Sequence, residues 1–388
     1  MFFIAIYAKL NFIPVRVSQY AIFGRAHLKP FTGAILSTET RRWRLWMYDF
    51  FVLVTAIDGF YVCTRFVQSL FVRELFHIEQ FPIHFFWGAS NLVVQFWTKQ
   101  SFFTWPGYTI GILRQISTNI STQVERNRPW NKMTRHELLA QYMHLMFFVT
   151  GIVMIGVILW DWSRLLLIYS SLPTRYQTEL TFFICLAFEI ISIFTEISCT
   201  SINFYKQVLF FELANNKLQG MIEKVQKSRT TGQQSLKEPV AQLRHLQLLV
   251  QCFNQGNCYM IFASKLICLS APVICGFVAI RFFHADPITG MLCIVLIFNA
   301  ITCYALIYEK AFLIPANMVA LKELIKVSLN ARRNKSFSEE ITKTLKSIPP
   351  IGVRVGSFNT MERSSTLIYI SFVTEKLASV LVVTKFRY

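Results

Sequence analysis

The stretch LTFFICLAFEIISIFTEISCTSINFY, from Leu180 to Tyr205, is apolar over a length that crosses a bilayer as one helix. It carries two carboxylates, Glu189 and Glu196, which are seven residues apart and therefore share one face of that helix. Charge inside hydrocarbon is costly, so such residues mark an ion path, a ligand contact or an internal pair. The stretch predicts a membrane-spanning helix with a functional face.

The composition of the whole chain agrees with a membrane protein. Its 388 residues are 54% hydrophobic and 15% charged, with a mean hydropathy of +0.43, whereas soluble domains carry about 25% charged residues. We therefore expect an all-α membrane protein with seven transmembrane helices. The predicted spans are Leu45–Phe71, Phe81–Trp105, Leu138–Trp160, Leu180–Tyr205, Cys252–Phe282, Pro287–Ile307 and Ser364–Phe386.

The basic residues are distributed unevenly between these spans. Of the 39 Lys and Arg residues, 29 lie before the first span or in every second gap, and five lie in the other gaps or at their edges. Lys and Arg concentrate on the cytoplasmic side of membrane proteins. This predicts a cytoplasmic N-terminus and an extracellular C-terminus, the reverse of a G-protein-coupled receptor. It also explains the net charge of +18 without nucleic-acid binding.

The long cytoplasmic gaps are predicted to be helical. We expect a cytoplasmic N-terminal segment over residues 1–44 and one transmembrane domain over 45–386, with a cytoplasmic helical hairpin at 206–250 and a cytoplasmic loop at 308–363. Apolar positions recur at helical spacing on both sides of a polar break at 228–234. The domain therefore continues beyond the bilayer.

Enzyme signatures are missing from the sequence. It contains no HExxH, GxSxG, P-loop or GxGxxG motif. The nine cysteines fall in or beside the apolar spans without metal-ligand spacing. Free thiols are one alternative for them, and a Cys275–Cys293 bridge is another. We expect no enzyme, no metal and no cofactor.

Three charged residues lie at similar depths of different spans. They are Asp58 in the first span, Glu196 in the fourth and Lys265 in the fifth. We expect Lys265 to pair with Glu196, with Asp58 as a further partner, because pairing lowers the cost of intramembrane charge. The alternative is that each group faces water or a neighbouring subunit by itself.

The outer halves of the spans are rich in aromatic residues. An apolar set with a few polar groups suits a small organic ligand. The alternative is that these aromatic residues face lipid or form interfacial belts. The ligand candidates are Trp87, Trp160, Phe183, Glu189, Phe277 and Phe282.

Two stretches resemble a known family. The segment from Gln242 to Asn254 (QLRHLQLLVQCFN) is a leucine-rich helix that leads to an Asn, and the run from Val380 to Thr384 is followed by Phe386 near the chain end. With the inverted seven-span plan, the sequence resembles arthropod gustatory and odorant receptors, and gustatory members in particular. It departs from the gustatory motif at three positions, where Ala, Ser and Lys replace Thr, Tyr and Gln: Ala378, Ser379 and Lys385.

The resemblance implies a function. Members of this family are ligand-gated, non-selective cation channels of the plasma membrane of sensory neurons, opened by tastants or odorants. The resemblance implies a homotetramer, or a heteromer with related subunits, surrounded by lipid. It also implies a pore lined by span seven at Ser379, Val382 and Lys385. Lys385 at the outer mouth of the pore would repel cations. Three alternatives follow: the Lys385 side chain turns away from the pore, the ion conductance is unusual, or the channel needs a different partner subunit.

Other functions are compatible with the same spans. A metabotropic seven-helix receptor, a transporter and a scaffold without conduction are the alternatives. A transporter is favoured by inverted repeats or broken spans, which the sequence does not show.

Overall fold

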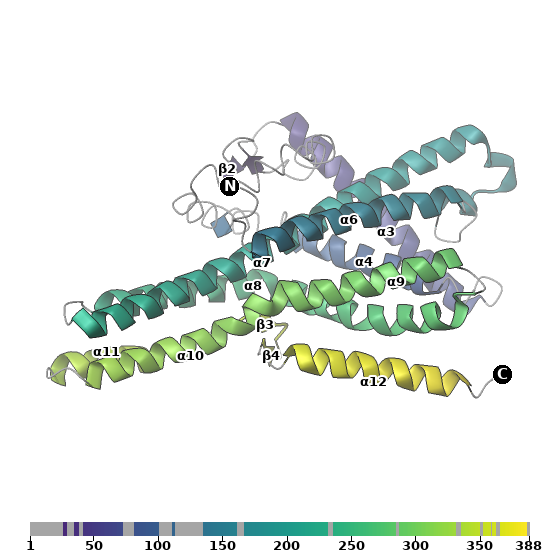
Figure 1. The fold of residues 1–388 in the computed structure, drawn as a ribbon. Helices are drawn as coiled ribbons and strands as arrows, with labels where there is room; N and C mark the ends of the chain where they lie inside the picture. Colours follow the sequence, from purple (N-terminus) through teal and green to yellow (C-terminus); the bar gives the residue numbers. More distant parts are fainter. Residues whose placement is uncertain are drawn as a thin grey trace. The chain divides into compact units, whose positions relative to one another are not determined.

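Long helices dominate the computed structural model (Figure 1), which describes residues 26–28, 35–38, 42–72, 81–100, 111–112, 135–160, 167–231, 236–284, 287–330, 335–349, 352–357, 359–361 and 365–385. Most of the N-terminal segment expected over residues 1–44 lies outside these ranges. The main helices are α3 (Arg42–Phe71), α4 (Phe81–Thr98), α6 (Arg135–Trp160), α7 (Glu179–Thr231), α8 (Lys237–Phe282), α9 (Pro287–Thr302), α10 (Tyr308–Asn330), α11 (Lys335–Ser347) and α12 (Ser365–Lys385).

Every predicted span falls on one of these helices. In the described part of the chain, four stretches are long and apolar enough to cross a membrane: Asp49–Phe71, Glu179–Lys227, Lys237–Phe282 and Pro287–Asn330. The prediction of a helical multi-pass membrane protein is confirmed. Seven crossings and the sides on which the two termini lie stay predictions.

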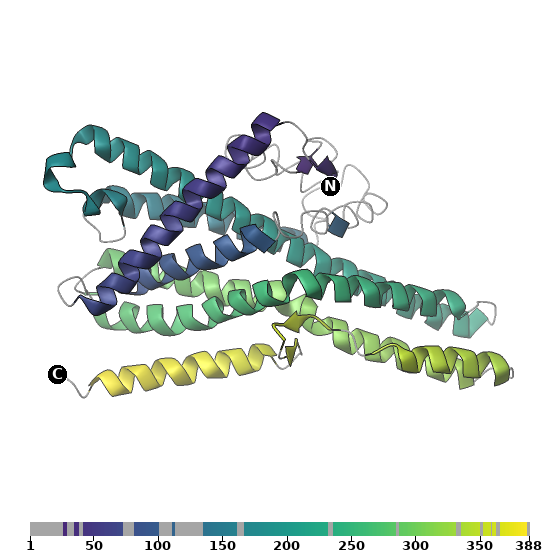
Figure 2. The ribbon, with the colours of Figure 1, turned by 180° about the vertical axis from the view of Figure 1, so that it is seen from behind.

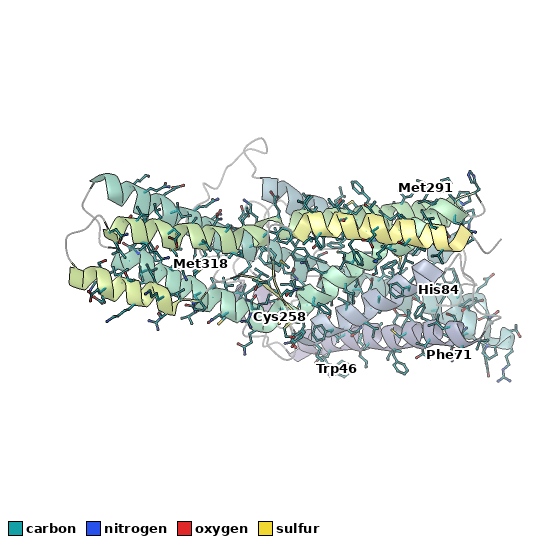
Figure 3. All side chains as sticks on the ribbon, turned by 90° about the horizontal axis from the view of Figure 1, so that it is seen from below. Trp46, Phe71, His84, Cys258, Met291 and Met318 are labelled. Atoms are coloured by element: carbon teal, nitrogen blue, oxygen red, sulfur yellow. The ribbon has the colours of Figure 1, made fainter. Side chains whose placement is uncertain are left out.

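Helix α3 shows the features of a membrane span. Trp46 and Phe71, labelled near its two ends in Figure 3, are 78% and 84% exposed. They are about 38 Å apart along the axis at 1.5 Å per residue, somewhat more than the hydrocarbon thickness of about 30 Å. Aromatic residues are enriched at both membrane interfaces, so α3 carries the expected markers of a full crossing.

Two details of the fold differ from the sequence prediction. Helix α7 continues to Thr231, past the predicted break at Ser228, and α8 begins at Lys237. Short antiparallel pairs also interrupt the all-α pattern. They are β1 (Ala26–Leu28) with β2 (Ile35–Thr38), and β3 (Arg354–Val355) with β4 (Asn359–Thr360). Gly356 has φ 61° in the β3–β4 turn, a conformation that glycine adopts without steric cost.

The chain divides into two compact units. Unit 1 consists of Met1–Lys206, Ala263–Tyr304 and Ile370–Tyr388, and unit 2 of Gln207–Phe262 and Ala305–Tyr369. Unit 2 therefore contains most of the predicted hairpin 206–250 and loop 308–363. Its core includes the rings of Phe210 and Phe253, which stack with centroids 3.9 Å apart.

Unit 1 has two apolar core clusters. One joins α3, α4, α6, α7 and α9 around Val62, Trp87 and Ile193. The other joins α4, α8 and α9 around Cys275 and Cys293. In both Figure 1 and Figure 2, α12 runs beside α8. The predicted ligand and pore residues all belong to this unit.

Candidate functional site

A group of buried polar side chains lies between α3 and α7 of unit 1. Asp58 on α3 is 1% exposed and Glu189 on α7 is 2% exposed. Ser192 Oγ donates a hydrogen bond of 2.6 Å to Asp58 Oδ2, and the backbone N–H of Ile168 donates one of 3.2 Å to Glu189 Oε1. Ser192 follows Glu189 by three residues and precedes Glu196 by four, so these three share one helix face.

Three carboxylate oxygens of this polar group have no hydrogen-bond partner among the described residues. Among the described residues, Asp58 Oδ1, Glu189 Oε2 and Glu196 Oε1 accept no hydrogen bond. The half-buried Glu196 lies within electrostatic range of Asp58 and Glu189, and none of the three forms an ion pair with a described residue. Buried polar atoms normally have partners. These oxygens are therefore acceptors that a donor beyond the described residues would satisfy.

Close packing of α3 on α4 forms one wall of this site. A Cβ atom at Gly59 would lie 2.9 Å from Asn91 Oδ1, so the two helices approach each other at this glycine. Asn91 is fully buried, and its Nδ2 donates to the carbonyl of Trp87 at 3.3 Å while its Oδ1 lacks a partner among the described residues. Asn91 and Ser192 were not identified as candidates from the sequence. For Ser192, the spacing from both glutamates was a usable signal.

The structure separates the six ligand candidates into three places. Trp87 lies in the same core cluster as Leu167, the residue before the Ile168 N–H that Glu189 accepts. Phe277 and Phe282 meet edge to face, with centroids 6.3 Å apart, beside the other cluster. Trp160 and Phe183 are 72% and 62% exposed and so do not line a site enclosed by this chain. Trp87 and Glu189 remain as neighbours of one interior site.

The predicted intramembrane ion pair has a different setting. Lys265 Nζ lies 5.3 Å from the centroid of the Tyr304 ring, and Asp58 accepts its hydrogen bond from a hydroxyl. The structure thus places an aromatic ring beside Lys265 and a hydroxyl beside Asp58. The pairing of Lys265 with Glu196 stays a prediction.

Helix α12, which carries the predicted pore residues, contacts its own chain with one face. A Cβ at Gly276 of α8 would lie 3.1 Å from two Leu377 methyl carbons, so Leu377 packs directly on α8. Ser379 and Val382 are both exposed, Val382 by 58%. The backbone of Lys385 ends the helix, and its side chain lies outside the described residues.

Two solved structures share this arrangement over nearly the whole chain. The insect olfactory receptor OR5 from Machilis hrabei aligns with a TM-score of 0.64 at 12% identity, over 97% of this chain and 99% of that one. The same receptor in complex with eugenol aligns with a TM-score of 0.61 at 14% identity, over the same shares. The chain has the fold of an insect olfactory receptor. No family model and no curated protein matches the sequence.

The olfactory-receptor fold confirms the family resemblance at the level of architecture. The expectation that the chain is not an enzyme stays a prediction, because a shared fold does not by itself establish function. All nine cysteines are free thiols, which corrects the alternative of a Cys275–Cys293 bridge. No group of His, Cys, Asp and Glu in the described residues could hold a metal ion.

In this olfactory-receptor fold, one side chain of unit 2 fastens the segment that precedes α12. Asn254 Nδ2 donates to the carbonyl of Gly352, and Asn254 Oδ1 accepts from the N–H of Arg354, both at 2.9 Å. The N–H of Gly356 donates to the carbonyl of Cys258 at 2.9 Å, and Figure 3 labels Cys258 beside this segment. Asn254 is the residue at the end of the leucine-rich stretch, and its role is to hold β3 on α8.

Proposed function

We propose that the chain is a chemosensory receptor that works as a ligand-gated, non-selective cation channel. Each copy contributes α12 to a shared pore, in a homotetramer or in a heteromer with related subunits. The receptor is placed in the plasma membrane with its N-terminus inside. The observation that carries this proposal is the exposure of α12.

An isolated copy leaves α12 largely uncovered. Leu367, Ile370 and Val383 are exposed by 73%, 53% and 67%, and only a strip that includes Leu377 packs on the same chain. Alongside these apolar residues, the exposed surface carries Glu375 and Ser379. A helix that is apolar on its flanks and polar between them suits an assembly in which neighbouring copies cover the flanks. The polar strip then faces a water-filled axis.

The ligand is a small molecule held by the interior site of unit 1. Trp87 supplies an aromatic surface, while Asp58 and Glu189 supply oxygens that accept a hydrogen bond. An apolar site with few, well-placed polar groups is typical of small-molecule binding. The solved complex of OR5 with eugenol supports a small organic molecule as the ligand class.

Gating joins this site to α12. Val382 lies one helical turn beyond Ser379 on the exposed face and is the narrow apolar point of the proposed pore, with Lys385 at its outer end. Ligand binding changes the packing of the unit 1 helices, and α12, which is held to them through contacts such as Leu377 with Gly276, moves outward at Val382. An apolar constriction of this kind closes a pore by dewetting.

The test combines assembly and current. Protein purified in lipid nanodiscs is expected to show four-fold particles with a central pore, and cells expressing it are expected to show currents evoked by small organic molecules. Glu189→Gln should change the concentration dependence of those currents, because it alters the free oxygen while keeping an acceptor for Ile168. Glu179→Gln, an exposed change in the first turn of the same helix, is the matched control. A single-copy particle without current would favour a metabotropic receptor, a transporter or a scaffold.

A further inference from the structure

Glu375 is a charged residue in the middle of α12, the helix that corresponds to the predicted seventh span. It is the eleventh of the 21 residues of α12, and its side chain is 67% exposed. Ionised side chains in the centre of a bilayer are rare and almost always face a protein interior or water. Most of the surface of the Glu375 side chain is therefore left uncovered by the described residues.

The direction of Glu375 follows from the burial pattern of α12. The partly covered positions Val373 and Leu377 face the chain's own helices. Glu375 is two residues from each of them, which is about 200° around an α-helix of 3.6 residues per turn. It therefore points directly away from the packed face.

The residues that share the Glu375 face are two serines and the apolar residues Ile368 and Val382. Ser371 precedes it by four residues, and Ser379 and Val382 follow it by four and seven, all on one helical stripe. All three are exposed. Ser379 is one of the proposed pore residues, so Glu375 lies on the same stripe as the proposed pore lining.

We propose that Glu375 faces the conduction pathway and sets its preference for cations over anions. This inference rests on the channel proposed above. In an assembly of several copies, their Glu375 side chains form a negative zone midway through the membrane, and rings of carboxylates are a recurring means of selecting cations. This negative zone lies about 15 Å along the helix from Lys385. It therefore attracts cations at a point of the pathway that is separate from any positive charge at the outer mouth.

Lys376 is the charged group nearest to this zone. Its Nζ lies 3.1 Å from Glu375 Oε1 and 5.8 Å from the centroid of the Phe372 ring. Both side chains of the ion pair are exposed, and pairs of this kind contribute little. Lys376 is one residue further round α12, so it points toward the flank of this helix on which a neighbouring copy packs in the proposed assembly. The Glu375 carboxylate stays directed at the pore axis.

The test compares two neutralising changes on adjacent residues. The reversal potential of ligand-evoked current is measured in voltage-clamped cells under a NaCl gradient. Glu375→Gln is expected to lower the Na⁺ to Cl⁻ permeability ratio several-fold, while Lys376→Gln leaves the ratio unchanged or raises it. An unchanged reversal potential in Glu375→Gln would overturn the inference, as would an equal fall in both variants.

A second variant keeps the test decisive if Glu375→Gln carries no current. Glu375→Cys is treated with a negatively or a positively charged methanethiosulfonate reagent, with the parent chain as the control for native thiols such as the exposed Cys252. The negative reagent should restore cation preference and the positive one should lower it further. Equal selectivity with both reagents would overturn the role of Glu375 in cation preference and leave the proposed channel standing. A parent chain that forms no oligomer and carries no current would instead overturn the proposed channel.

Discussion

The inner face of α7 and the outer face of α12 each carry carboxylates, with opposite surroundings. On α7, Glu189 is 2% exposed and accepts a backbone hydrogen bond, and Ser192 binds Asp58 of α3. On α12, Glu375 is 67% exposed and its carboxylate forms an ion pair with the neighbouring Lys376. The first face is completed within one chain, except for a few oxygens that suit a ligand. The second face needs water or other copies, so in the proposed channel we assign recognition to the first face and conduction to the second.

The largest effect is expected where the segment leading to α12 is fastened. Asn254→Ala removes the partners of the Gly352 carbonyl and the Arg354 N–H. Since each buried polar group left without a partner costs about 1–3 kcal/mol, we expect the change to lower the free energy of unfolding by about 3 kcal/mol. Thermal unfolding of purified protein in nanodiscs would measure it.

The control for this variant is Asn254→Asp, which keeps the acceptor for Arg354 and loses only the donor to Gly352. It should lie between the parent and Asn254→Ala. Equal stability of all three proteins would show that the loop before α12 is held by other contacts, and α12 would then not depend on this anchor.

A smaller effect is expected from removing the hydroxyl that joins α3 to α7. Ser192→Ala leaves the buried Asp58 carboxyl without a hydrogen bond from the described residues, which should cost about 2 kcal/mol of unfolding free energy. Ser379→Ala on α12 is the counterpart, and it should change stability by less than about 0.5 kcal/mol because its site is exposed. Similar losses in both variants would erase the distinction between the inner and outer faces.

Sequence patterns predicted most of the helical architecture, because long apolar runs and basic loops are consequences of the bilayer itself. Leu45–Phe71 and Leu138–Trp160 were each predicted within three residues of α3 and α6 at both ends. The leucine-rich stretch up to Asn254 was noticed, but the partners of Asn254 lie about a hundred residues further along the chain. No local pattern contains such a contact.

The candidate sites were less predictable. Helical periodicity shows which residues share one face of a helix, but it does not show which other helix packs against that face. Trp160 and Phe183 had the same composition signal as Trp87, yet they point outward. Glu375 was not identified as a candidate from the sequence. Its significance came from the position of Leu377 against Gly276, which fixes the rotation of α12.

The smallest effect is expected from the double change that tests the predicted ion pair across α7 and α8. If Lys265 pairs with Glu196, Lys265→Ala should destabilise the protein strongly and Glu196→Gln should partly rescue it. The structure instead holds Lys265 over the Tyr304 ring, so we expect the two losses to add, with a coupling energy below about 0.5 kcal/mol. Unfolding of the parent, both single variants and the double variant gives this coupling directly. A coupling energy of about 1 kcal/mol or more would show that Glu196 pairs with Lys265. In that case only the free oxygens of Asp58 and Glu189 would remain for ligand binding.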